Sequence, residues 1–173
     1  MSCLLYLVRH AIAEPRGETP DAERRLTVQG ARRMRRAALG LKRLGLVPDL
    51  ILSSPLRRAE ETAGILLPIL SPDVSIEIYE PLAPGCPVPQ VISGLQKYRR
   101  AHRLVLVGHQ PALGELASQL LSSSSTLVPL PFKKGGAAAI EVSALPPRAA
   151  GILKWFLTAK HLRLLARAKQ LRT

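Results

Sequence analysis

Short runs of apolar residues alternate along the chain with longer segments in which apolar residues recur at helical spacing. Four short runs predict strands, at residues 4–8, 49–53, 74–79 and 104–109. The run at residues 4–8 is brief and apolar throughout, so it suits a strand that is buried on both faces, whereas residues 74–79 alternate apolar and acidic positions. Four segments predict helices, at residues 31–44, 54–67, 91–98 and 111–121. Strands that alternate with helices in this way predict an α/β fold with a mostly parallel sheet.

The ends of the first two helices carry recognisable signals. Thr27 is a plausible N-cap for the helix that begins near Ala31, and Gly45 follows its last turn. Ser54-Pro55 predicts the start of the second helix, with the serine as N-cap and the proline in the first turn. Pro68 predicts the end of that helix near Leu67.

The C-terminal part of the chain has a different pattern. Residues 136–142 and 151–156 predict an antiparallel hairpin, and residues 159–172 predict a basic amphipathic helix. The expected architecture is therefore a three-layer sandwich: a mostly parallel central sheet flanked by helices, with an antiparallel strand at its C-terminal edge. With 173 residues and no internal repeat, the chain is expected to form a single domain over residues 1–173.

Composition narrows the classes of partner. The net charge of +13 favours anionic partners, such as phosphorylated groups, acidic protein surfaces or nucleic acid. Aromatic residues make up only 3%, which argues against a module that stacks nucleic-acid bases. No apolar run reaches the ~18 residues that would span a bilayer. Cys3 and Cys86 have no metal-ligand spacing and are expected to be free thiols, and with no signal peptide evident we expect a cytoplasmic protein.

Basic side chains follow three of the predicted strands. Arg9 and His10 end the first run, Arg57 lies in the turn after the second, and His109 ends the fourth. Ligands bind at the carboxyl ends of parallel strands, so these four side chains are expected to meet at one edge of the sheet. Two arginines and two histidines are costly to bury together unless they surround an anion such as a phosphate dianion.

Four motifs together resemble the histidine phosphatase superfamily, which includes cofactor-dependent phosphoglycerate mutases. In order they are Leu7-Val8-Arg9-His10-Ala11, residues 26–30 (LTVQG), residues 53–62 (SSPLRRAEET) and residues 106–111 (LVGHQP). The short chain and its C-terminal segment are most similar to the small phosphohistidine phosphatases of the SixA type. Ala11 stands where the family usually has glycine. The resemblance implies a phosphoglycerate mutase-like fold.

The resemblance also implies roles for the four residues. His10 would be the nucleophile, forming a phosphohistidine intermediate, with its other ring nitrogen bonded to a backbone carbonyl. Arg9, Arg57 and His109 would hold the phosphate oxygens, His109 as an imidazolium, without a metal ion or other cofactor. The expected activity is metal-independent phosphohydrolysis, with a phosphohistidine protein in phosphorelay signalling as substrate. A small-molecule phosphomonoesterase of the same superfamily is the alternative, and a nucleic-acid-binding module without catalysis is a weaker one.

Other polar residues carry weaker signals. Glu80 occupies the position of the general acid of larger relatives, but an exposed loop carboxylate or a helix cap is the simpler interpretation. Arg58 is expected on the surface, and His102 and His161 are expected to have surface or structural roles. Residues 133–136 (KKGG) either border the pocket or simply lead into the hairpin. Phosphate or sulfate is the expected ligand of the site.

Overall fold

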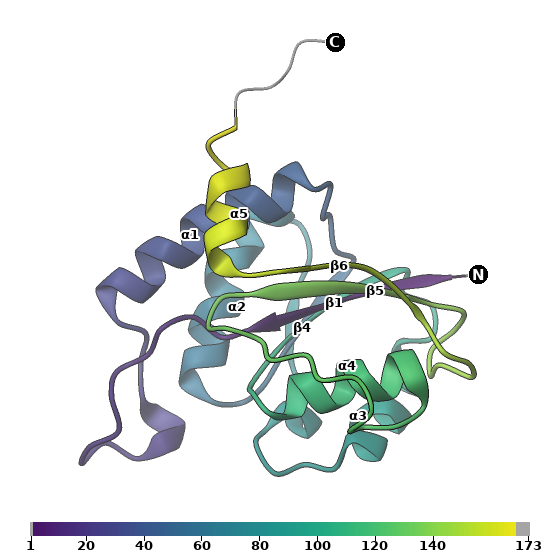
Figure 1. Ribbon diagram of the computed structural model, residues 1–173. Helices are drawn as coiled ribbons and strands as arrows, with labels where there is room; N and C mark the ends of the chain where they lie inside the picture. Colours follow the sequence, from purple (N-terminus) through teal and green to yellow (C-terminus); the bar gives the residue numbers. More distant parts are fainter. Residues whose placement is uncertain (1, 169–173) are drawn as a thin grey trace.

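One mixed sheet organises the chain, and the computed structural model describes residues 2–168. Within that range six strands follow the order β3-β2-β4-β1-β5-β6 (Figure 1). They are β1 (Cys3–Arg9), β2 (Leu50–Ser53), β3 (Ile76–Ile78), β4 (Arg103–Gly108), β5 (Ala137–Val142) and β6 (Ile152–Leu157). The first four strands are mutually parallel, whereas β5 runs antiparallel to β1 and β6 antiparallel to β5. The predicted fold class and C-terminal hairpin are confirmed.

Helices cover both faces of this sheet. They are α1 (Val28–Arg43), α2 (Arg57–Leu70), α3 (Val88–Gly94), α4 (Ala112–Ser122) and α5 (Ala159–Leu165). Helices α1, α2 and α5 pack on one face, and α3 and α4 pack on the other (Figure 1). Alternation along β1 explains the two cores, because Leu5 and Leu7 point to the α3–α4 side while Tyr6 and Val8 point to the other.

Three single-turn 3-10 helices lie in the connections. They are η1 (Asp21–Glu23), η2 (Glu80–Leu82) and η3 (Leu95–Tyr98). The long connection between β1 and α1 returns to its origin, because Ala13 forms an isolated antiparallel bridge with Leu26. This return places η1 near the carboxyl end of β1. Among the described residues, no helix is long and apolar enough to cross a membrane.

Helix α2 differs from its predicted bounds at both ends. It begins at Arg57 after Leu56, rather than at the Ser54-Pro55 pair, and it continues through Pro68 to Leu70. Pro68 lies in the last turn, where it removes one backbone hydrogen bond, while Leu66 and Leu70 stay buried on either side of it. Burial of this stripe therefore outweighs the local preference of proline.

The remaining differences concern segment ends. The third strand is shorter than predicted, and the following helix starts earlier and continues as η3. The last helix ends at Leu165, and residues 169–172 of its predicted range lie outside the described residues. The parallel order of β2, β4 and β1 brings the carboxyl ends of these strands together at one edge, where the basic residues were expected.

Candidate active site

His10 directly follows β1 and is held by its backbone neighbour. Its Nδ1 lies 2.7 Å from the carbonyl oxygen of Ala11, which can only accept a hydrogen bond, so Nδ1 carries the proton. The side chain is buried, and burial lowers the pKa of His10 to about 4, against a smaller opposing effect of the bond to Ala11. The charges of Arg58, Arg9 and Lys134 lower this pKa further. His10 is therefore a neutral imidazole at pH 7, with the lone pair on Nε2.

Arg58, rather than Arg57, is the arginine of α2 that reaches His10. Its Nε donates to His10 Nε2 at 3.3 Å, and its side chain is only 5% exposed. Arg57 is 50% exposed and pairs with Glu61, one helical turn further along α2. The prediction that placed Arg57 in the site and Arg58 on the surface was therefore wrong. Because α2 begins at residue 57, the side chain that faces the sheet edge belongs to the second residue of the helix.

The loop before α1 fixes the guanidinium of Arg58. One terminal nitrogen donates to the carbonyl oxygen of Asp21 at 2.6 Å, and the other pairs with the Asp21 carboxylate at 3.0 Å. Burial opposes ionisation of this carboxyl, but hydrogen bonds from Arg58 and Arg24 outweigh it and lower the pKa of Asp21. Asp21 thus stays ionised and keeps the plane of the Arg58 guanidinium against His10.

His109 follows β4 and faces His10 across the sheet edge. The two ring centroids are 5.0 Å apart, and His109 Nε2 lies 2.8 Å from the hydroxyl oxygen of Ser54. Burial lowers the pKa of His109 to about 3, and the neighbouring His10 and Arg58 lower it further. In the free site His109 is therefore neutral at pH 7, rather than the imidazolium expected from the sequence.

Arg9 closes the site on the side of β5. One of its terminal nitrogens donates to the carbonyl oxygen of Phe132 at 2.6 Å. The loop that follows Phe132 returns to β1, because the Gly135 N–H lies 3.1 Å from the carbonyl oxygens of both Arg9 and His10. Residues 133–136 therefore border the site in addition to leading into β5.

Two buried nitrogens in this cluster lack a partner among the described residues: Arg9 Nε and His109 Nδ1. Buried polar groups normally have a hydrogen-bond partner, so two nitrogens without one beside a reactive imidazole are typical of a ligand site. With the guanidinium of Arg58 they offer nitrogen donors to an anion. In the part of the chain that the structure describes, no group of three or more His, Cys, Asp or Glu side chains could hold a metal ion.

The other candidate residues lie outside the cluster. Glu80 is exposed at the start of η2, and the backbone N–H of the preceding Tyr79 donates to the carbonyl oxygen of Ser53, so Glu80 stands at the same edge of the sheet. His102 and His161 are exposed, as predicted. Cys3 is buried at the opposite end of β1, and burial raises the pKa of its thiol to about 11. That thiol is therefore protonated and unreactive at neutral pH.

Sequence reasoning missed Arg58, Ser54 and Asp21. For Arg58 a signal existed: it lies four residues before the buried Thr62 and eight before Leu66, so it shares their face of α2. No comparable signal marks Asp21, because its place depends on how the long loop folds back. Ser54 was predicted only as the N-cap of the second helix.

Comparison with known proteins identifies the family to which this chain belongs. Residues 5–83 match the model of the histidine phosphatase superfamily (branch 1). A protein of Picosynechococcus sp., described only as uncharacterised, is 39% identical over 136 residues, which cover 76% of this chain and 81% of that protein. The chain belongs to branch 1 of the histidine phosphatase superfamily.

Solved structures of several phosphatases have the same fold. The protein histidine phosphatase SixA complexed with tungstate superposes with a TM-score of 0.81 at 24% identity, covering 92% of this chain and 99% of that one. The α-ribazole phosphatase from Shigella flexneri gives 0.72 at 18% identity, over 90% and 96%. A mycobacterial glucosyl-3-phosphoglycerate phosphatase gives 0.69 at 17%, over 91% and 100%. At these identities the likeness concerns the fold. Membership of the superfamily makes the chain a phosphatase of that superfamily.

Proposed function

We propose that this protein hydrolyses phosphohistidine on a partner protein, through a phosphoryl group carried transiently by His10. One observation carries the proposal: His10 is a neutral imidazole whose Nδ1 proton is held by the Ala11 carbonyl, which leaves Nε2 unprotonated, with a lone pair for nucleophilic attack. An imidazole in this state attacks phosphorus without first losing a proton.

The proposed reaction has two displacements on phosphorus. In the first, His10 Nε2 forms a bond to phosphorus as the bond to the substrate imidazole breaks, and that imidazole takes a proton from solvent water on the released nitrogen and leaves as the neutral ring. In the second, water attacks the phosphorus of phospho-His10, and the N–P bond breaks to release inorganic phosphate and restore the neutral ring. No metal ion or cofactor has a part in this scheme.

Arg9, Arg58 and His109 would stabilise the transferred phosphoryl group. Arg58 stands in the role that the sequence had given to Arg57, because its Nε already donates to His10 Nε2. On arrival of phosphate this donor would move to a phosphate oxygen, while Asp21 keeps the guanidinium in place. A dianion beside His109 would raise the pKa of this imidazole and favour its protonated form.

Three observations favour a phosphohistidine over a phosphate ester as substrate. Glu80 is the candidate general acid, yet it is exposed and its carboxylate makes no hydrogen bond or ion pair within residues 2–168. A P–N bond needs less help from such an acid, because the leaving imidazole is readily protonated. SixA is also among the most similar folds, and its structure was obtained with tungstate, an oxyanion. The net charge of +13 suits an acidic protein partner.

The test compares three substrates with the same enzyme in the presence of EDTA: a protein bearing phosphohistidine, p-nitrophenyl phosphate and 3-phosphoglycerate. We expect rapid release from phosphohistidine, little from the two esters, and none from any of them with His10→Ala. Turnover of the esters without turnover of phosphohistidine would instead identify a small-molecule phosphomonoesterase. Steeply salt-dependent DNA binding unaffected by His10→Ala, with no turnover, would point to a nucleic-acid-binding module.

A further inference from the structure

A groove of about 360 Å³ opens beside His10 on the side of α1 and α5. It shares Arg9 and Ala11 with the candidate active site and continues between the start of α1, the loop 133–136 and the start of α5. Its apolar lining includes Ile12 and Met34. A group bound in the groove would therefore lie next to a phosphoryl group on His10.

Besides Arg9, four cations line this groove: Arg33, Lys133, Lys134 and Arg163. None of them forms an ion pair with a carboxylate among residues 2–168, whereas the exposed Lys97 and Lys154 each have an acidic partner. Burial lowers the pKa of Arg163, and the charges of Arg33, Arg167 and Arg36 lower it further. The groove thus concentrates positive charge that the chain itself leaves uncompensated.

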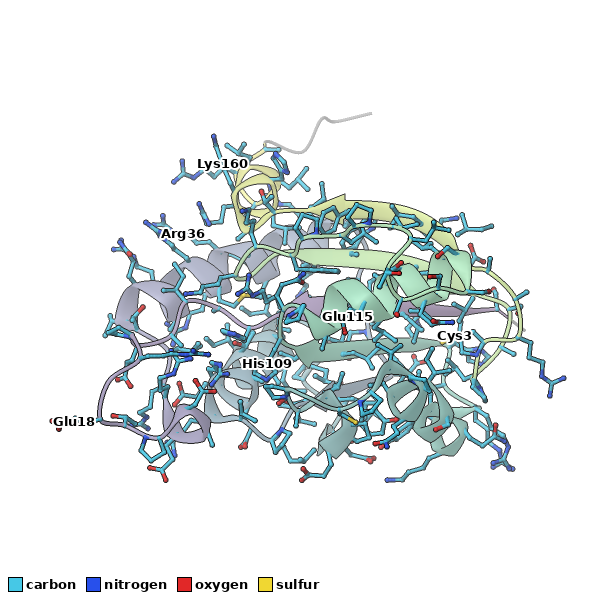
Figure 2. All side chains as sticks on the ribbon, turned by 60° about the horizontal axis from the view of Figure 1, so that its bottom comes forward. Cys3, Glu18, Arg36, His109, Glu115 and Lys160 are labelled. Carbon is cyan, nitrogen blue, oxygen red and sulfur yellow. The ribbon has the colours of Figure 1, made fainter. Side chains whose placement is uncertain are left out.

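The positive charge extends beyond the groove. Helix α1 carries six basic residues and no acidic one, and α5 also has no acidic residue. The basic side chains of α1 run from Arg32 to Arg43, roughly 16 Å along the helix axis. Figure 2 shows Arg36 and Lys160 projecting from these two helices on the same side of the molecule. A small anionic metabolite would occupy only the groove, whereas an acidic protein surface can also form ion pairs with the basic side chains of α1 and α5.

We propose that the groove receives acidic side chains that flank the phosphohistidine of the partner protein. This inference rests on the proposed function and specifies which phosphohistidine substrates are preferred. Carboxylates next to the phosphorylated residue bind Arg33, Lys134 and Arg163. The methylene groups of a Glu or Asp side chain pack against Met34 and Ile12. The carboxylates of the partner thus orient its phosphohistidine toward His10 Nε2.

The experiment uses two peptides that contain phosphohistidine and differ only in its neighbours, which are Asp and Glu in one and Asn and Gln in the other. The test variant is Arg33→Glu/Arg163→Glu. The control is Arg99→Glu/Arg100→Glu, which makes the same charge change at the opposite end of β1, in a hollow beside Cys3. For the wild type we expect a kcat/KM about tenfold higher for the acidic peptide.

The variants should separate the groove from general charge effects. We expect this preference to disappear in the test variant, to persist in the control, and to weaken in ~0.5 M salt, where exposed charges are screened. Arg33 is exposed, so Arg33→Gln serves as a milder variant and should lower the preference about threefold.

Four results would overturn the inference. Equal hydrolysis of the two peptides by the wild type would show that the groove does not bind acidic side chains of the substrate, and so would a preference retained in the test variant. Either result leaves the proposed function standing. Hydrolysis of p-nitrophenyl phosphate without hydrolysis of either peptide would contradict the proposed function itself. Equal hydrolysis combined with inhibition by a short DNA duplex, lost in the test variant, would assign the groove to nucleic acid instead.

Discussion

At the scale of single residues, the state of His10 is set by its immediate neighbours. The Ala11 carbonyl fixes the tautomer, burial keeps the ring neutral, and the Arg58 guanidinium occupies Nε2 in the free site. The sequence supplied His10 and the expected bond to a backbone carbonyl. The low pKa of His10 could not be predicted from the sequence, because it depends on burial of the ring and on the charges of Arg58, Arg9 and Lys134.

The pH dependence of kcat/KM reports this low pKa. Protonation of His10 Nε2 removes the attacking lone pair, so the protonated form is inactive, and its pKa of about 4 lies below the ordinary 6.5. After correction for titration of the substrate, we expect a constant kcat/KM from about pH 8 down to about pH 5 and a fall at lower pH. A midpoint near 6.5 would contradict the environment described for His10.

Two adjacent arginines at the start of α2 provide a matched pair. Arg58 donates to His10 and is fixed by Asp21, whereas Arg57 forms an exposed ion pair with Glu61. We expect Arg58→Ala to lower kcat/KM by about 10²–10³-fold and Arg57→Ala to change it less than about twofold. Steady-state kinetics, with circular dichroism to verify folding, measures both. Similar losses in the two variants would show that neither arginine is singled out by its position.

At the scale of elements, helix ends were predictable where a cap acts alone. Thr27 caps α1 as expected, with its hydroxyl accepting from the Gly30 N–H at 2.9 Å. Ser54 does not cap α2, because its hydroxyl is the partner of His109. The phase of α2, and with it the choice between the two arginines, follows from where the helix begins. Tertiary contacts of the site decide this, and the local sequence does not show them.

The contact between α1 and α5 depends on one glycine. A Cβ added at Gly40 would lie 2.0 Å from the carbonyl oxygen of Leu162, so α5 would have to move. At Gly64 in α2 an added Cβ meets nothing within 4 Å. We expect Gly40→Ala to lower the free energy of unfolding by about 1–3 kcal/mol, and Gly64→Ala to raise it by up to about 1 kcal/mol. Urea unfolding distinguishes the two, and equal effects would contradict this packing.

At the scale of the whole molecule, the sheet order assembles the site. His10 follows β1 and His109 follows β4, and these strands are neighbours in the sheet, with β2 next to β4. Alternating apolar runs predicted the α/β class and the convergence at one edge. They did not predict the groove, because its cations come from α1, the loop 133–136 and α5, which are far apart in the sequence. The single domain expected for residues 1–173 stays a prediction.

The most direct measurement is the site of the phosphoryl group during turnover. The wild type is mixed with a phosphohistidine substrate and quenched in alkali, and the phosphorylated residue is mapped by mass spectrometry, with ³¹P NMR to identify the ring nitrogen. The account predicts one phosphoryl group, on His10 Nε2, and none in His10→Ala, which should also lack turnover. A phosphoryl group on another residue, or turnover that persists in His10→Ala, would contradict it.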